Sequence, residues 1–419
     1  MHTPPPHTRQ IEDLQALLQV TRELAANTEL LPLLACVEQA ARRVLGCERA
    51  TVFLYDTATD ELVSQLATGV EEIRFSADRG IAGEVVRTGQ VIHVPDAYAD
   101  ARFNPEIDRR TGFRTHNLLS FPLLGMDNRT VGVLQVLNKH SGDFTAWDRE
   151  VVQALGAQVG VAVQRQMLMD AHADKLRLQR DLNIARQIQQ GLLPTAPADV
   201  PGFDVTGWNR PADETGGDCF DHLRLPGGQL ALTLADATGH GIGPALIMTE
   251  CRALFHALIT VTPDLADVVA RVNNLLAADL PDGKFVTAFF GLLSPAEHTL
   301  SWVSAGQAPL FQYHARSGQL LELQAGGIPA GIVADFPYDA PTRWTMEPGD
   351  FMLLVTDGFL ECTDAAGELF GSERLKAVIR AHSAGSSADI IRGMTQAIEA
   401  FAGGLPQADD LTALVVRRR

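Results

Sequence analysis

Cysteine is scarce in this chain, with five residues among 419. No two of them have the spacing of a CxxC pair, and no Cys/His cluster is present. Small secreted domains depend on paired cysteines, and structural zinc sites depend on such clusters. The sequence therefore predicts a protein of a reducing compartment, without a disulfide framework and without a structural zinc site.

Basic side chains are also few: 34 Lys and Arg stand against 51 Asp and Glu, for a formal net charge of −17. Nucleic acids and anionic membranes recruit clustered Lys and Arg, so this balance argues against both as partners. The N-terminus, MHTPPPHTRQ, lacks the apolar core of a signal peptide. No apolar stretch approaches the roughly 18 residues of a membrane helix, because Gln, Arg or Asp interrupts each candidate. We therefore expect a cytoplasmic protein that binds neither nucleic acid nor a membrane.

The length of 419 residues exceeds what one ordinary core occupies, so two or more domains are expected. A hydrophobic content of 46% with 20% charged residues is typical of a globular chain. Composition and pattern predict a flexible N-terminus with a first helix, a small α+β domain, a helical linker and a β-rich domain, at residues 1–27, 28–166, 167–199 and 200–419.

The first of these domains shows two pairs of predicted strands between helices. The segment ATVFLYDTATDELVSQLA is typical of strand, turn and strand, and LLSFPLLGMDNRTVGVLQVLNK repeats that arrangement. Helix, paired strands and a closing helix indicate a sensor-like α+β domain with an antiparallel sheet and flanking helices.

The linker carries a partial heptad pattern. Alternating steps of three and four from Leu168 to Leu192 meet eight positions, of which all but Lys175 and Gln189 are apolar. This pattern favours a helix that pairs with a second copy as a coiled coil. A helix packed on its own domains explains it about as well.

In the β-rich domain, acidic residues recur where predicted strands end. Asp236 follows the apolar run of LADATGHGIGPALIM, and Asp357 follows another in LLVTDGFLE. Asp218 comes after two glycines in GGDCFD, and Asp409 and Asp410 directly precede the last strand. Each acid taken alone is explained by ordinary turn or capping chemistry.

Convergence of these acids is reasonable only with cations among them. Unpaired carboxylates at one point would repel strongly, whereas hard divalent cations require oxygen ligands. Two such ions about 3.5–4 Å apart lower the pKa of a shared water and neutralise charge on a transferred phosphoryl group. The residues by themselves leave both interpretations open, a metal centre and a set of turns.

Four segments occur in this order: PADETGGDCFD, ADATGHGIGPALIM, MEPGDFMLLVTDGFLECTDAAGELFGSERL and ADDLTALVV. Together they resemble the motifs of metal-dependent type 2C serine/threonine phosphatases. The likeness is to the bacterial branch that includes the sporulation stage II phosphatase and the stress-response sigma-factor regulators, and it covers about residues 180–419. It implies an αββα sandwich with a binuclear Mn²⁺ or Mg²⁺ centre at one edge and no protein nucleophile.

The resemblance also implies which residues hold the metal ions. Asp236 would bridge both ions and be central to catalysis, and Ala237 would offer its backbone carbonyl. Asp357 and Asp409 would supply further ligands. Asp218 would bind a metal ion directly or through water.

Three residues are expected to support this ligand set. Gly358 lies directly behind Asp357, and Asp410 would orient Asp409 or bond to the turn. His240 is a candidate general acid for the leaving serine oxygen. Its spacing from the metal aspartate differs from that of the acid histidine in eukaryotic relatives, so a place in the turn or beside the phosphate is favoured over that role.

The front domain carries two further passages, RFSADRGIAGEVVRTGQVIHVPDAYADARFNPEIDRRTGFRTHNLLSFPL and NKHSGDFTAWDRE. They resemble GAF domains, in particular those that bind cyclic nucleotides in phosphodiesterases and cyanobacterial cyclases. The family implies a structural ion pair between Lys139 and Asp148, and Thr111 and Thr115 match positions that contact the nucleotide. A GAF domain that binds another ligand, or that only dimerises, is the alternative.

These observations predict a signalling phosphatase in which a GAF sensor acts through a helical linker on a metal-dependent serine/threonine phosphatase domain. The family implies a phosphorylated STAS-type anti-anti-sigma protein as the substrate, and hence a part in sigma-factor regulation. The linker pattern and the habit of GAF domains favour a homodimer. The competing hypothesis is a catalytically silent GAF ligand sensor or scaffold.

Overall fold

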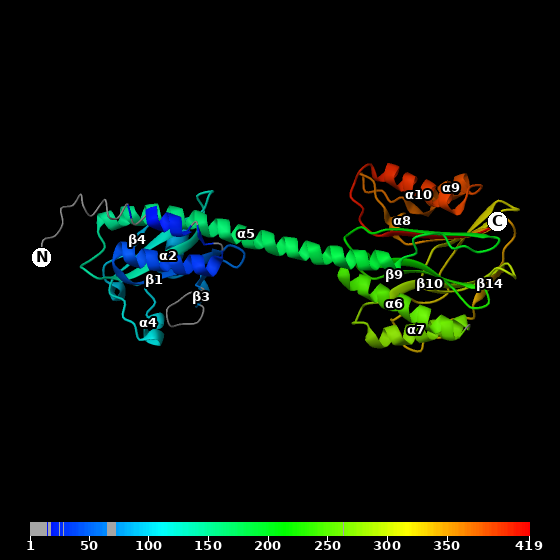
Figure 1. The fold of residues 1–419 in the computed structure, drawn as a ribbon, viewed down its shortest axis with the longest axis horizontal. Helices are drawn as coiled ribbons and strands as arrows, with labels where there is room; N and C mark the ends of the chain where they lie inside the picture. The colour runs from blue at the N-terminus through cyan, green and yellow to red at the C-terminus, as the bar shows by residue number, and fades with distance from the viewer. Residues whose placement is uncertain (1–14, 16–17, 25, 28, 65–72, 263) are drawn as a thin grey trace. The chain divides into compact units, whose positions relative to one another are not determined.

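The chain is described by a computed structural model that covers residues 15, 18–24, 26–27, 29–64, 73–262 and 264–419. It forms two compact units, Met1–Arg177 and Leu178–Arg419. Of the predicted N-terminal segment 1–27, residues 1–14 lie outside the described residues, whereas residues 18–24 are helical. One long helix, α5 (Ala146–Leu192), runs from the first unit into the second (Figure 1).

The first unit is built on one antiparallel sheet of six strands in the order β3-β2-β1-β6-β5-β4. The strands are β1 (Cys47–Asp56), β2 (Glu61–Ser64), β3 (Ile73–Ser76), β4 (Ile92–Val94), β5 (Leu118–Leu124) and β6 (Thr130–Lys139). The helices are α2 (Leu30–Leu45), α3 (Gly80–Thr88), α4 (Glu106–Thr111), the 3₁₀ turn η1 (Ala97–Ala99) and the first part of α5.

Alternation along the strands sends side chains to both faces of this sheet. On one face Val52 and Leu134 pack with α2 and α5 in the larger core. On the other face Phe53 and Val133 pack with α3. Helix α5 approaches β5 so closely that a Cβ atom on Gly160 would lie 2.2 Å from a carbonyl oxygen of that strand. The sheet is therefore covered by helices on both faces, as the sequence predicted.

The second unit contains two antiparallel sheets of five strands each, in the orders β14-β11-β10-β9-β8 and β13-β12-β15-β16-β7. The first sheet consists of β8 (Asp218–Arg224), β9 (Leu230–Ala237), β10 (Val286–Ser294), β11 (Thr299–Ala305) and β14 (Thr342–Thr345). The second consists of β7 (Phe203–Arg210), β12 (Leu310–His314), β13 (Gln319–Leu323), β15 (Phe351–Val355) and β16 (Leu411–Arg418).

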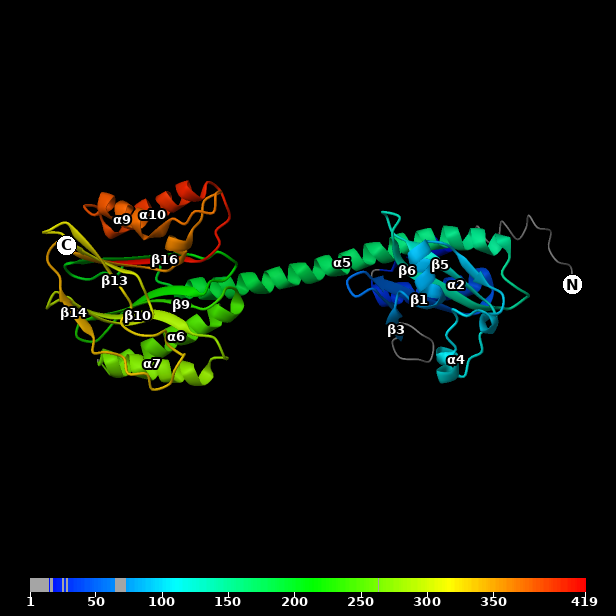
Figure 2. The ribbon, with the colours of Figure 1, turned by 180° about the vertical axis from the view of Figure 1, so that it is seen from behind.

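Helices cover the outer face of each sheet, as Figures 1 and 2 show from opposite sides. Helices α6 (Ile242–Val261) and α7 (Leu265–Asp279) pack on the first sheet, for example through Phe255 against Phe290. Helices α9 (Gly371–His382) and α10 (Ser387–Ala402) pack on the second sheet, and the short α8 (Gly358–Glu361) follows β15. A third core, with Phe289 and Leu414, lies between the sheets. This αββα sandwich confirms the predicted fold class.

Helix α6 corrects one expectation from the sequence. Among the described residues it is the one helix that is long and apolar enough to cross a membrane by length and composition. In this fold its buried side chains Met248, Cys251, Phe255 and Ile259 belong to the core against the first sheet. Burial against a sheet and burial in lipid select similar side chains. A core helix such as α6 can therefore be as long and as apolar as a membrane-spanning helix.

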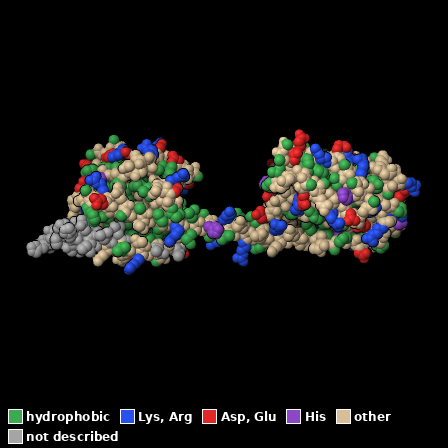
Figure 3. Space-filling view, turned by 90° about the horizontal axis from the view of Figure 1, so that it is seen from above, with side chains coloured by type: hydrophobic (Ala, Val, Ile, Leu, Met, Phe, Trp, Pro, Cys, Tyr) green, Lys and Arg blue, Asp and Glu red, His purple; other side chains and the backbone are tan. Residues whose placement is uncertain are grey.

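The surface of each unit mixes the two signs of charge. Lys, Arg, Asp and Glu side chains are interspersed over both units on the face seen in Figure 3. Within α5 the residues Leu168 and Leu178 are 56% and 59% exposed. Two apolar positions in the first half of the predicted linker pattern are therefore accessible.

Candidate metal centre

Two predicted metal ligands lie opposite each other on neighbouring strands of the first sheet of the second unit. Strands β8 and β9 pair in a register that sets Asp218 opposite Asp236. Asp218 is the first residue of its strand, and Asp236 is the last but one of its own. The antiparallel pairing thus brings both acids to the same edge of the sheet.

The second sheet carries its acids to the same place. Strand β15 ends shortly before Asp357, β16 begins directly after Asp410, and the two strands pair antiparallel. Thr356 Oγ1 donates a hydrogen bond of 2.7 Å to Asp218 Oδ2. This bond joins the edges of the two sheets at the predicted metal centre.

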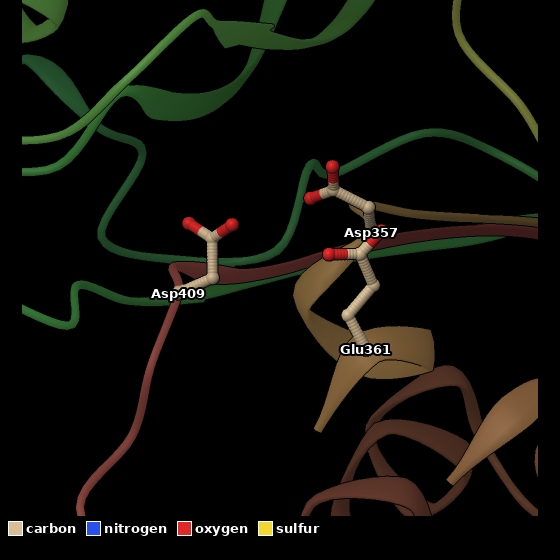
Figure 4. Close-up of side chains that lie close together, drawn as sticks. All are labelled: Asp357, Glu361 and Asp409. Atoms are coloured by element: carbon tan, nitrogen blue, oxygen red, sulfur yellow. The ribbon is translucent and has the colours of Figure 1, made fainter. Parts of the chain in front are cut away.

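Three exposed acids gather at this edge (Figure 4). One carboxylate oxygen of each of Asp357, Glu361 and Asp409 lies within 4.8 Å of the other two. Glu361 was absent from the residues proposed from the sequence. Its signal was the spacing DGFLE, because a residue four places after Asp357 lies one helical turn away. Helix α8 has only four residues, too few to show a helical pattern in the sequence.

The acids of this edge disfavour one another's charge. The pKa of Asp236 is raised to about 7, mainly by burial and further by the nearby carboxylates of Asp357 and Asp409. The pKa of Asp218 is raised well above its usual range, mainly by burial and further by the carboxylates of Asp236 and Asp410. Desolvation and Asp409 also raise the pKa of Asp357. A divalent cation would stabilise all these carboxylates as anions, and oxygens are the ligands that Mg²⁺ and Mn²⁺ prefer. The donor set therefore fits such ions.

Asp410 occupies a different position from its neighbour Asp409. It is 5% exposed and accepts hydrogen bonds from the backbone N–H groups of Ala212 at 2.7 Å and Asp218 at 3.3 Å. A Cβ atom on Gly216 would lie 2.5 Å from Asp410 Oδ2, and one on Gly358 would lie 2.1 Å from the Asp410 carbonyl oxygen. The glycines at both positions therefore permit the close packing around Asp410 that positions Asp218.

The side chain of Gln189 in helix α5 contacts the loop before β8. Gln189 Nε2 donates to the carbonyl oxygen of Gly216 at 2.5 Å, and the N–H of Gly216 donates to Gln189 Oε1 at 3.1 Å. The amide thus bonds both polar groups of the glycine that packs against Asp410. The end of the linker helix is connected by hydrogen bonds to the loop before β8.

Ala237 and His240 follow Asp236 on the same edge. Ala237 is buried, and its N–H donates to the Gly217 carbonyl oxygen at 3.0 Å. A Cβ atom on Gly217 would lie 2.8 Å from the Ala237 carbonyl oxygen, so glycine at this position avoids a clash with that oxygen. The His240 side chain is 82% exposed, and its Nδ1 lies 2.9 Å from Asp213 Oδ2. Its ring contacts Asp213 in the loop before β8 instead of an acid of the cluster.

In the first unit, a cavity of about 590 Å³ lies between the sheet and the segment around α4. Thr115 is part of its wall, is buried, and is held by Asp108 through Oγ1–Oδ1 at 2.9 Å and N–Oδ2 at 2.7 Å. Phe53, Phe75 and Phe103 supply aromatic faces to the same wall. Thr111 ends α4, but its side chain lies outside the described residues.

Lys139 and Asp148 form a buried ion pair in this unit, with side chains 6% and 8% exposed. Burial favours a raised pKa for Asp148, but the Lys139 ammonium and the N–H and hydroxyl of Thr145 outweigh it, so the pKa lies below its usual range. The pair connects the end of β6 to the start of α5. It lies outside the wall of the cavity.

Comparison with known protein families assigns both units. Residues 226–419 match the family described as stage II sporulation protein E (SpoIIE), and residues 29–163 match the GAF domain family. Both families are those that the motifs indicated from the sequence, so this recognition is confirmed.

Individual relatives agree with the division. The chain is 25% identical over 242 residues to "Phosphoserine phosphatase RsbU" of Bacillus subtilis, which covers 58% of this chain and 71% of that protein. It is 33% identical over 144 residues to "Probable 3',5'-cyclic phosphodiesterase pde-5" of Caenorhabditis elegans, which covers 31% of this chain and 20% of that protein. The chain therefore spans about a fifth of the length of the nematode relative.

Among solved structures, the second unit is similar to the "SiaA-PP2C domain of Pseudomonas aeruginosa". The TM-score is 0.52 at 22% identity, with 58% of this chain and 98% of that chain covered. At this identity the likeness concerns the fold, and it agrees with the αββα sandwich described above.

Proposed function

We propose that this chain is a GAF-regulated, metal-dependent serine/threonine protein phosphatase, because residues 226–419 match the SpoIIE family and residues 29–163 match the GAF domain family. The observation that supports the activity most directly is the meeting of Asp218, Asp236 and Asp357 at one edge of two sheets. Acids with raised pKa values that meet at one place are typical of a functional site, and metal ions would stabilise them as anions. We place this activity in the cytoplasm.

Two Mn²⁺ or Mg²⁺ ions would be held by the carboxylates of Asp218, Asp236, Asp357, Asp409 and Glu361. When bound, such ions lower the pKa of a water and offset the charge that develops on a phosphoryl group. Asp236, between the two sheets, is the residue we assign to both ions, with the Ala237 carbonyl beside it. Asp410 accepts a hydrogen bond from the backbone N–H of Asp218 and so fixes the position of that residue.

Hydrolysis requires that a water oxygen bond to phosphorus while the bond to the serine oxygen breaks. The leaving oxygen then needs a proton. His240 is the residue of this chain that we assign to the transfer: with both ring nitrogens protonated, it would give its Nε2 proton to the leaving oxygen, while Nδ1–H donates to Asp213 Oδ2 and fixes the ring. His240 lies at the exposed face of the edge, where a phosphoprotein can approach.

The activity is tested by phosphate release from p-nitrophenyl phosphate with Mn²⁺. Asp236→Asn and Asp357→Asn should each lower kcat/KM by at least about a hundredfold, because each removes a charged ligand. Asp267→Asn, on the exposed surface of α7, is the matched control and should behave as the wild type. Release that is independent of metal, or equal in the three variants, would defeat the enzyme assignment and favour the silent scaffold.

For the substrate we propose phosphoserine or phosphothreonine on a regulatory protein, of the STAS anti-anti-sigma type that the family resemblance implies. The similarity to a protein named as a phosphoserine phosphatase supports the phosphoserine part of this proposal. A phosphorylated STAS protein should be dephosphorylated faster than its isolated phosphopeptide, as measured by mass spectrometry. Equal rates would argue against recognition of the folded partner.

For the GAF domain we propose a cyclic nucleotide as the ligand of the cavity beside Thr115. The cavity volume of about 590 Å³ lies in the range of small-molecule sites, and its aromatic walls suit a purine. Cyclic AMP or cyclic GMP should raise the melting temperature of the full chain, and Thr115→Val should reduce that shift. A melting temperature that neither nucleotide changes would exclude this ligand class.

We further propose that the chain forms a homodimer through α5. Leu168 and Leu178 lie on the predicted heptad seam and are more than half exposed. Leu178→Asp should therefore shift the mass measured by light scattering toward that of a monomer, whereas Arg177→Asp, one position off the seam, should not. A monomeric wild type would favour the alternative of a helix that serves its own domains only.

A further inference from the structure

A second cavity opens beside the acid cluster, with a volume of about 510 Å³. Glu361 and Asp409, two members of the cluster, are also part of its wall. The rest of the wall comes from the C-terminal end of α10, the loop that leads to β16 with the first residue of that strand, Arg210 at the end of β7, and Gly358, Cys362 and Thr363 in and after α8. The cavity and the candidate metal centre are therefore neighbours that share side chains.

The buried part of this cavity's wall is apolar. Ile398 and Leu411 form a buried part of its wall, 2% and 1% exposed, and Ala402 adds a small side chain at the end of α10. Leu405, on the loop, is 44% exposed and so presents apolar surface at the entrance. An apolar interior of this size accommodates a side chain together with part of its backbone.

The single arginine of this wall is occupied by contacts within the chain. Arg210 is already engaged: its Nε donates to Gln407 Oε1 at 2.7 Å and its Nη1 to Glu399 Oε1 at 2.6 Å. Gln407 in turn donates to the carbonyl oxygens of Arg210 and Asp409, at 2.8 and 2.7 Å. Arg210 is thus held by Gln407 and Glu399, and the charges of Glu361 and Asp409 would be offset by the metal ions proposed above, so this wall offers a carboxylate little attraction.

Resting on the phosphatase function proposed above, we propose that this cavity is a specificity subsite that seats an apolar side chain next to the phosphorylated serine or threonine of the protein substrate. A phosphoryl group at the acid cluster places the adjoining residues of its own chain at the shared wall of Glu361 and Asp409. The apolar interior then favours leucine-sized side chains. Burying a carboxylate among these apolar side chains costs free energy, so aspartate and glutamate are disfavoured at the same position. The subsite would thus select among phosphoproteins that all present the same phosphoryl group.

The experiment measures kcat/KM of the full chain with Mn²⁺ on phosphoserine peptides in an alanine background. A single leucine, and then a single aspartate, is moved from three positions before to three positions after the phosphoserine. At one position we expect leucine to exceed alanine by at least about tenfold, the scale of discrimination that apolar pockets reach, and aspartate to fall below alanine. A peptide series without any preference for leucine would overturn the proposal.

A variant then ties the preference to the cavity. Ala402→Phe fills the space at the end of α10, and the ratio of leucine to alanine peptide should fall toward one. Ala400→Phe, on the exposed side of the same helix, should retain the wild-type ratio. If Ala402→Phe does not fold, Leu405→Asp in the exposed loop makes the same test by adding charge at the entrance. A ratio that survives in the cavity variant as it does in Ala400→Phe would refute the assignment.

The two proposals fail in different ways. If neither the peptides nor p-nitrophenyl phosphate is hydrolysed in a metal-dependent manner, the phosphatase function itself is wrong. If p-nitrophenyl phosphate and all peptides are hydrolysed without discrimination, the function stands and the subsite is refuted.

Discussion

The contact of Gln189 with Gly216 offers a sharp test of how the linker helix bears on the metal centre. Gln189→Ala removes both hydrogen bonds to the glycine. Alanine has the highest helix propensity, so α5 itself should not be weakened. The perturbation is therefore confined to the connection between the helix and the loop before β8.

The size of the effect follows from the two bonds. A neutral hydrogen bond contributes about 0.5–1.5 kcal/mol net, so the pair contributes about 1–3 kcal/mol. Gly216 packs against Asp410, which accepts a hydrogen bond from the N–H of Asp218. If the released loop must be ordered again when metal binds, this free energy is lost from metal affinity. The Mn²⁺ dissociation constant should then rise by about 5-fold to 150-fold, since 1.4 kcal/mol corresponds to a factor of ten.

Isothermal titration of the metal-free protein with Mn²⁺ measures this change directly. Gln190→Ala is the matched control, because Gln190 is the next residue of the same helix and is exposed. The wild type and Gln190→Ala should bind Mn²⁺ alike. Equal affinities in Gln189→Ala and Gln190→Ala would refute the reasoning that α5 supports the metal centre through this amide.

Three further predictions concern stability and the acid cluster. Lys139→Met leaves Asp148 buried without its ion-pair partner and should lower the free energy of unfolding by about 3–5 kcal/mol in urea titrations, whereas Arg271→Met, which breaks an exposed pair, should cost less than about 1 kcal/mol. The metal-free protein should melt at a lower temperature at pH 8 than at pH 5. Asp236, with a folded pKa of about 7 against an ordinary 3.8, contributes stability that is lost as its carboxyl ionises across that window. Gly358→Ala places a methyl group 2.1 Å from a backbone carbonyl oxygen behind the cluster and should weaken Mn²⁺ binding by about tenfold in the titration described above.

Each of these has an outcome that contradicts it. Equal losses in Lys139→Met and Arg271→Met would mean that burial does not distinguish the two ion pairs. The pH effect should shrink when Mn²⁺ is present, because the cation stabilises the ionised carboxylates; a melting temperature that rises from pH 5 to pH 8 without metal would refute the sign. Wild-type Mn²⁺ affinity in Gly358→Ala would show that the loop yields to the added methyl group without disturbing the site.

The strand-end acids were predictable because of a local rule. An Asp at the end of an apolar run, with a glycine one to three residues later, exposes a carboxylate and leaves room for other backbone to approach. This pattern is visible at Asp236, before Gly239, and at Asp357, before Gly358, without any tertiary information. Motif order then indicated both families. Glu361 was missed for the opposite reason. A helix of one turn leaves no periodic signal, and only the folded position of Asp409 makes Glu361 part of a cluster.

Helix α6 shows the limit of composition. The residues of Ile242–Val261 are apolar enough for a membrane span, yet the helix packs on the first sheet. Hydrophobic residues in a sequence predict that a helix surface is buried. They do not predict whether a sheet or a membrane buries it, because this depends on the rest of the fold.

By itself the sequence determined the α+β class, the order of a GAF domain, a helix and a phosphatase domain, and the acids placed at strand ends, because these follow from periodicity, glycine position and motif order along one chain. Only the tertiary structure decided that Asp218 and Asp236 stand opposite each other, that Gln189 bonds to Gly216, and that Arg210 closes a cavity beside the acids. These contacts join residues from different strands, helices and loops. Register and sheet packing create them, and neither is written in any single segment.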